Sequence, residues 1–161
     1  MSEVDPYALD LATLSWLAGG AANEYLLAAI RMAGHPQLRI SHGYVFQMLV
    51  DGPKSIGALA EQLGVTQQAA SKVVAELTGF GYLKALPGAT DRRIRQIALS
   101  KRGEEALEAA RSARAELDSR LLATVDPETM AGARRALAAL LDAAGGMEAT
   151  RRRRVRAPNL E

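Results

Sequence analysis

The stretch that most constrains the fold of this chain lies near its centre. Two runs of apolar residues recur there at i, i+3, i+4 and i+7, the spacing of one helix face: Ile56, Leu59, Ala60, Leu63, then Ala70, Val73, Val74, Leu77. Between the runs, Gly64-Val65-Thr66 supplies a residue that tolerates positive φ, a buried turn residue and a helix N-cap. The sequence therefore predicts a helix-turn-helix.

The second helix of this pair carries polar residues on its outer face. Gln67, Gln68, Ser71 and Lys72 lie on that face, directly after Thr66. Gln pairs with adenine, Lys donates to guanine acceptors, and Thr66 with the free N–H groups of the helix start can hold a phosphate. We expect this helix to enter the major groove of DNA, although helix-turn-helix pairs also occur in protein-binding modules.

A β-hairpin is predicted after the second helix, which makes the unit a winged helix. "GFGYLKAL" turns into a short strand, and "RQIALS" returns as its partner. The tip carries Asp91, Arg92 and Arg93, with Arg95 close behind. Such a tip reaches the neighbouring minor groove, whose negative potential attracts an inserted arginine. Asp91 is expected to pair with Arg93 and fix its direction; the alternative is an ordinary solvated tip.

The charge distribution fits one module that meets a polyanion. The 161-residue chain has a formal net charge of +2, yet residues 52–103 hold 8 Lys and Arg against 3 Asp and Glu. The apolar content of 48% and the charged content of 24% are typical of a soluble globular protein. Because the chain has no cysteine, disulfides, thiolate metal sites and cysteine redox sensing are excluded.

Helices are predicted on both sides of the winged helix. The caps and breakers that bound them give the ranges 6–33, 41–51, 100–125 and 127–144. The first begins at Asp5-Pro6 and is about 40 Å long. The last carries an apolar stripe formed by Met130, Ala133, Leu137, Leu140, Leu141 and Ala144. We expect these helices to build a two-fold dimer; a monomeric helix bundle is the alternative.

This ordered set of features resembles the MarR-type winged-helix transcriptional regulators. The likeness rests on "LAEQLGVTQQAASKVVAEL" followed by "GYL", on Asp91-Arg92-Arg93 as an Asp-x-Arg motif, and on "IALSKRGEEAL" where the family usually shows Leu-Thr-x-x-Gly. It implies a mainly α fold with a small β-hairpin, in which a winged helix-turn-helix is joined to a helical dimerisation region from both termini. By its position in the motif, Arg93 maps onto the family's minor-groove arginine.

The resemblance also implies a domain organisation and partners. We expect a DNA-binding domain at 37–100, a dimerisation region at 1–36 and 101–147, and a homodimer on double-stranded DNA with a pseudo-palindromic operator. The predicted DNA contacts are Ser55, Thr66, Gln67, Gln68, Ser71, Lys72, Asp91, Arg92, Arg93 and Arg95. The expected function is that of a transcriptional regulator, a repressor, in the cytoplasm.

A small-molecule pocket between the dimer base and the winged helix is a further implication of the resemblance. The aromatic groups that could line it are Trp16, Tyr25, His42, Tyr44 and Phe46; plain core packing is the alternative for each. We expect a small aromatic or phenolic effector to release the protein from DNA. The competing hypothesis is an architectural or silencing protein that binds DNA without any ligand.

Other function classes find little support in the residues. No nucleophile elbow, P-loop or pair of carboxylates on a shared face is present, so we expect no enzyme and no cofactor. The two histidines, seven residues apart across a proline, do not favour a zinc site; one histidine together with carboxylates is the alternative. No apolar run suggests a membrane partner. The basic tail at 148–161, with "RRRRVRAP", is expected to be disordered, and either to add phosphate contacts or to solubilise the C-terminus.

Overall fold

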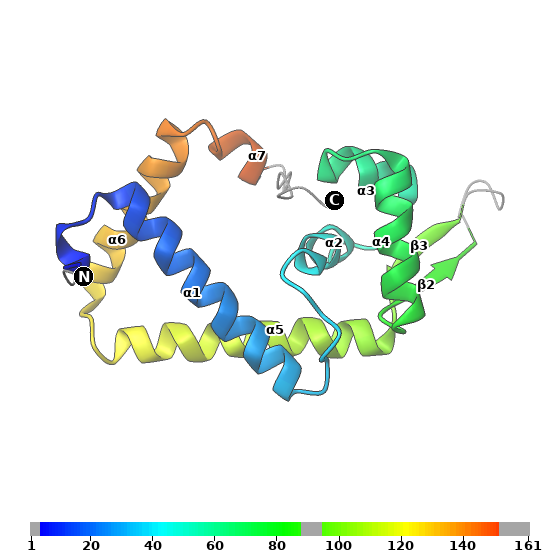
Figure 1. Cartoon of the computed structure of the whole chain (residues 1–161), viewed down its shortest axis with the longest axis horizontal. Coiled ribbons are helices and arrows are strands. Elements are labelled where there is room, and N and C mark those ends of the chain that lie inside the picture. The colour runs from blue at the N-terminus through cyan, green and yellow to red at the C-terminus, as the bar shows by residue number, and fades with distance from the viewer. Residues whose placement is uncertain (1–3, 88–94, 152–161) are drawn as a thin grey trace.

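The computed structural model describes residues 4–87 and 95–151 of the chain. Helix α5 (Lys101–Leu122) runs along the base of the molecule, and α1 (Leu11–Met32) crosses it (Figure 1). The winged helix-turn-helix lies at one end of α5, and α6 (Pro127–Ala143) lies toward the other (Figure 1). The fold is mostly helical with a small antiparallel sheet, which confirms the predicted fold class.

The N-terminal helix starts later than the sequence predicted. Asp5 and Pro6 do begin a helical turn, but it is the 3₁₀ helix η1 (Pro6–Ala8) and it ends after three residues. Helix α1 begins at Leu11, because the carboxylate of Asp10 caps it by accepting hydrogen bonds from the backbone N–H of Thr13 at 2.9 Å and from its hydroxyl at 2.7 Å. The prediction of one helix from Asp5 to Gly34 is therefore wrong at its start. At 22 residues α1 spans about 33 Å.

The helix-turn-helix forms as predicted. Helix α3 (Ile56–Leu63) ends at Gly64, whose φ of +68° is the left-handed conformation expected there. Helix α4 (Gln67–Gly79) begins after Thr66, whose hydroxyl accepts a hydrogen bond from the N–H of Ala69 at 3.2 Å. Before this pair lies α2 (His42–Leu49), within the range that the sequence predicted.

The hairpin forms too, but it belongs to a three-stranded sheet. Strand β2 (Leu83–Leu86) pairs antiparallel with β3 (Gln96–Leu99), and β1 (Lys54–Ser55) joins the other edge of β3. The registers place Ala85 opposite Ile97 on one side and Lys54 opposite Ile97 on the other. Strand β1 was not predicted, because two residues are too few to show any alternation.

The C-terminal helices follow their predicted caps. Asp126 caps α6 by accepting hydrogen bonds from the N–H groups of Glu128 and Thr129, both at 3.0 Å. A further short helix, α7 (Met147–Arg151), covers the first residues of the segment predicted as a basic tail. The rest of that tail, residues 152–161, lies outside the described residues.

The hydrophobic core lies almost entirely within the winged-helix end. Leu59, Leu77 and Tyr82 have no exposed surface, and the inner faces of α2, α3, α4, the sheet and the first half of α5 surround them. By contrast, α1 and α6 contain no buried residue. The two ends of the molecule are thus packed very differently within one chain.

A close contact at Gly103 fixes how α5 leaves the sheet. A Cβ atom at this position would lie 2.3 Å from the carbonyl oxygen of Tyr82, which is too close for any real contact. The backbone N–H of Gly103 donates a hydrogen bond to the hydroxyl of Ser100, the N-cap residue of α5, at 3.1 Å. Gly103 is the glycine of the Leu-Thr-x-x-Gly motif noted in the sequence. The structure shows why this position needs a glycine: a Cβ would collide with the Tyr82 backbone.

We therefore expect Gly103→Ala to lower the free energy of unfolding by about 1–3 kcal/mol, the usual cost of overpacking. Chemical denaturation measures this change. The matched control is Gly57→Ala in α3, where a Cβ would meet only Ser55 Oγ at 3.9 Å. There alanine should be neutral or stabilising, by up to about 1 kcal/mol, because it favours the helix. Equal effects of the two substitutions would contradict the steric account.

Candidate nucleic-acid interface

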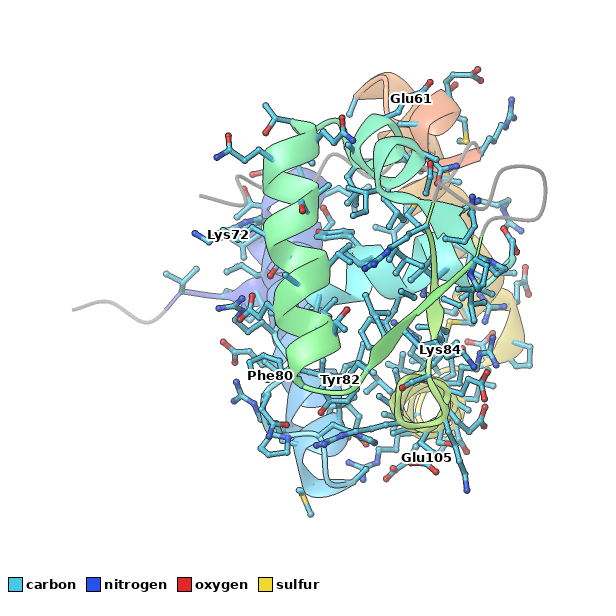
Figure 2. The ribbon with its side chains drawn as sticks, turned by 90° about the vertical axis from the view of Figure 1, so that its right-hand side faces the viewer. Glu61, Lys72, Phe80, Tyr82, Lys84 and Glu105 are labelled. Atoms are coloured by element: carbon cyan, nitrogen blue, oxygen red, sulfur yellow. The ribbon has the colours of Figure 1, made fainter. Side chains whose placement is uncertain are left out.

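The start of α4 presents a polar face to solvent. Ala70, Val73, Val74 and Leu77 are buried against the core, so the opposite face of the helix points outward. Gln67, Gln68, Ser71 and Lys72 are all exposed there, next to the cap residue Thr66. Figure 2 shows Lys72 on the outer side of α4, pointing away from the rest of the domain. The structure thus brings five of the sequence-predicted residues onto one exposed helix end.

The remaining predicted DNA contacts lie elsewhere. Ser55 is half-buried, and its hydroxyl caps α3 by accepting a hydrogen bond from the N–H of Ala58 at 3.2 Å. Arg95 is exposed immediately before β3. Asp91, Arg92 and Arg93 lie outside the described residues, so their predicted pairing at the hairpin tip stays a prediction.

A polar cluster that sequence reasoning did not find connects α4 to the segment before α2. Nη2 of Arg39 donates to Oε2 of Glu76, on α4, at 2.5 Å and lies 3.0 Å from Nε2 of His42. The His42 ring is only 1% exposed. Its Nδ1 accepts a hydrogen bond from the Arg39 backbone N–H at 3.3 Å, and its Nε2 lies 3.5 Å from Glu76 Oε2. Because Arg39 and Glu76 are 37 residues apart, no local sequence pattern could have paired them.

A second such cluster braces the base of the hairpin. The hydroxyl of Tyr82 donates to Oε1 of Gln37 at 3.1 Å, and Nη2 of Arg102 donates to the same oxygen at 3.3 Å. The Arg102 guanidinium also lies 4.8 Å from the centre of the Tyr82 ring, a cation–π distance. These contacts hold the start of α5 against the loop that follows α1.

A cavity of about 90 Å³ lies between α1, α2 and α5. Its wall is mostly apolar, with contributions from Leu26, Leu27, Ile30 and Phe46, but it also includes the two arginines Arg39 and Arg114. No carboxylate belongs to the wall among the residues that the structure describes.

Only some of the residues predicted to line a pocket do line this cavity. His42 and Phe46 do line the cavity. Trp16 is 76% exposed on α1, Tyr25 lies beneath the Arg120 guanidinium at 5.4 Å, and Tyr44 is partly buried against the core cluster. These last three do not belong to the cavity wall of the single chain.

Comparison with known proteins finds a family match and similar solved structures. Residues 37–94 match the model of the MarR family. None of the curated proteins matches the chain. Among solved structures, RV1404 from Mycobacterium tuberculosis is 26% identical, with a TM-score of 0.73 over 90% of this chain and 98% of that one. The transcriptional regulator Tm0710 from Thermotoga maritima is 22% identical, with a TM-score of 0.60 over 85% and 93%.

A third similar protein is known with bound molecules. A mutant of MepR from S. aureus bound to an oligodeoxyribonucleotide is 18% identical to this chain, with a TM-score of 0.55 over 84% of this chain and 98% of that one. MepR has also been solved bound to ethidium bromide, with 16% identity and a TM-score of 0.63 over 84% and 96%. At these identities the likeness shows a shared fold.

The fold and the exposed end of α4 define a winged helix-turn-helix protein. Residues 37–94 match the MarR family model, which confirms the resemblance predicted from the sequence. The fold is shared with Tm0710, a transcriptional regulator. Within the described part of the chain, no helix is long and apolar enough to span a membrane, and no cluster of three potential metal ligands occurs.

The buried histidine of the polar cluster is held neutral. Burial lowers the pKa of His42, and the neighbouring Arg39 charge lowers it further, against an opposing effect of Glu76. The folded-state pKa thus lies below the value of 6.5 that an unfolded chain would show. His42 therefore contributes stability that is fully present above about pH 6.5 and is lost as the pH falls through the folded-state pKa.

We expect the protein to lose thermal stability between pH 7 and pH 5, and His42→Gln to reduce that loss because the glutamine does not titrate. Melting temperatures of both proteins across this range measure the difference. His35, whose pKa is also lowered by burial, titrates in both proteins and so serves as an internal background. A steeper loss in the variant than in the native protein would show that His42 does not carry this dependence.

Proposed function

We propose that the protein is a dimeric, sequence-specific transcriptional regulator, a repressor that a small-molecule ligand releases from its operator. The observation that carries the proposal is the polar outer face of α4, which is exposed at the start of a helix whose other side is fixed in the core. The MarR-family match over this same domain supports it.

The chemistry of that face suits the major groove. Gln67 and Gln68 offer paired donors and acceptors of the kind that recognise adenine, and Lys72 offers a donor for guanine or phosphate. Free N–H groups at the first turn of α4 favour a phosphate near Thr66. At the hairpin, Arg92, Arg93 and Arg95 would follow the duplex to the adjacent minor groove, with Asp91 orienting Arg93. We also propose that the protein acts in the cytoplasm.

The terminal helices support a second copy of the chain as the other partner. Helix α1 contacts α5 and α6, yet neither α1 nor α6 buries a residue within one chain. Large apolar side chains remain exposed over these elements: Tyr7, Leu11, Leu14, Trp16, Leu17, Leu121, Leu122 and Leu137. A monomeric bundle would cover them, whereas a two-fold dimer built from residues 1–36 and 101–147 explains why they stay exposed. Such a dimer would carry two copies of the DNA-binding domain at 37–100, related by the two-fold axis.

The cavity supports the ligand-release part of the proposal. It lies between the α1–α5 crossing and α2, so its occupant would contact both the dimerisation region and the DNA-binding domain. Its apolar wall and its two arginines, Arg39 and Arg114, suit a small aromatic or phenolic effector that carries negative charge. A ligand-independent architectural protein would share α4 but would have no use for this cavity.

DNA binding is tested by selecting duplexes from a random pool and titrating the selected and scrambled duplexes at several salt concentrations. We expect Lys72→Ala to weaken binding to the selected duplex by about 1–3 kcal/mol, as for other base or phosphate contacts. Affinity should fall steeply with salt.

The matched control is Lys84→Ala on β2, which removes the same charge from the same domain. Lys84 lines a groove between the sheet and α5, away from α4, so its loss should matter much less. Equal affinity for selected and scrambled duplexes would leave an architectural role. If Lys72→Ala and Lys84→Ala weaken binding to the selected duplex equally, α4 is not the element that recognises the DNA sequence.

A further inference from the structure

Arg39 lies between the cavity and α4, the proposed recognition helix. Arg39 belongs to the short segment between α1 and α2, and it lines the cavity together with His42. The same side chain donates from Nη2 to Oε2 of Glu76 at 2.5 Å, and its Nη2 is 3.0 Å from the buried His42 ring. Two regions that the proposed function needs to connect therefore share a single side chain.

Glu76 is well placed to influence how α4 sits. It lies one helix turn after Lys72, and its side chain is 31% exposed. Helix α4 packs against α3 and β2, and the contact with Arg39 adds a link to the segment before α2. His42 strengthens this link, because its ring is fixed by burial and its Nε2 faces the same Glu76 oxygen at 3.5 Å. Loss of the link would leave α4 attached on fewer sides.

The cavity gives Arg39 a reason to change partner. An anion in this mostly apolar space has only arginine side chains as charged partners in the described wall. A carboxylate binds a guanidinium best through two parallel N–H groups, and each such pair uses an N–H of Nη2. In Arg39 this Nη2 already donates to Glu76 and lies 3.0 Å from the His42 ring, so a second carboxylate binds with good geometry only when Nη2 leaves these partners.

We propose that Arg39 has two mutually exclusive partners: Glu76, which positions the recognition helix for DNA, and an anionic ligand in the cavity. The proposal rests on the proposed function, since it names how occupancy of the cavity reaches α4. Glu76 is thus a positioning residue that acts through Arg39. The binding of ligand and the correct placement of α4 oppose each other by a direct exchange of charge partners.

Glu76→Gln separates positioning from simple electrostatics. Removing an acid from a DNA-binding helix should tighten binding to every duplex if only charge matters. The matched control is Glu61→Gln on α3, an exposed acid of the same helix-turn-helix on a different helix (Figure 2). We expect Glu76→Gln to reduce the ratio of affinities for the selected and scrambled duplexes by roughly two- to fivefold, the range for a partly exposed ion pair. Glu61→Gln should leave that ratio unchanged.

The second measurement follows the cavity in the absence of DNA. Calorimetric titration with benzoate, and with its uncharged analogue benzamide, should show tighter benzoate binding to Glu76→Gln than to the native protein, because the internal competitor has gone. Arg39→Gln should lose the preference for benzoate over benzamide. If Arg39→Gln does not fold, Glu76→Gln carries the test alone.

The outcomes separate this proposal from the proposed function. An unchanged ratio in Glu76→Gln, a benzoate affinity no higher than native, or no benzoate binding by either protein overturns the exchange of partners. Failure of the native protein to prefer selected duplexes overturns the proposed function instead. A lower ratio together with tighter benzoate binding in Glu76→Gln supports both.

Discussion

The packing of α5 against the carbonyl oxygen of Tyr82 is the contact on which the rest of the structure depends. It requires Gly103, since any Cβ there would strike the Tyr82 backbone. From that point Ala106, Leu107, Ala110 and Ala113 continue the winged-helix core, while the far half of α5 meets α1 and leaves Leu121 and Leu122 exposed. One continuous helix thus joins the winged-helix core to the terminal helices.

The elements governed by local signals could be predicted from the sequence. Thr66 and Asp126 are N-caps next to apolar periodicity, so α4 and α6 begin where expected. Asp5 and Asp10 show where such signals become ambiguous: both are capping residues, and each does start a helical turn, but only the one at Asp10 continues as an α-helix. Strand β1 forms because Lys54 and Ser55 lie beside β3 in space. Two residues are too few to show a strand pattern, so the sequence could not predict this pairing.

The candidate site was predictable to a similar extent. The exposed residues of α4 follow from helix periodicity once the buried face is known, and the structure brings them together. The Arg39–His42–Glu76 cluster does not follow, because it depends on the path of the chain between residues far apart in sequence. The cavity likewise arises from the crossing of α1 over α5 beside α2, so His42 and Phe46 line it whereas Trp16, on an exposed part of α1, does not. Which residues line the cavity is decided by how α1, α2 and α5 pack in space, and the sequence pattern does not contain that information.

The central claim is that two copies of α4 read one duplex, held at a fixed distance by the terminal helices. Hydroxyl-radical footprinting of the protein on a selected duplex tests this claim most directly, because it maps each contacted stretch of backbone without assuming an oligomeric state. The account predicts two protected regions related by a dyad, with centres about one helical turn of DNA apart. A single protected region without a symmetry-related partner would contradict it.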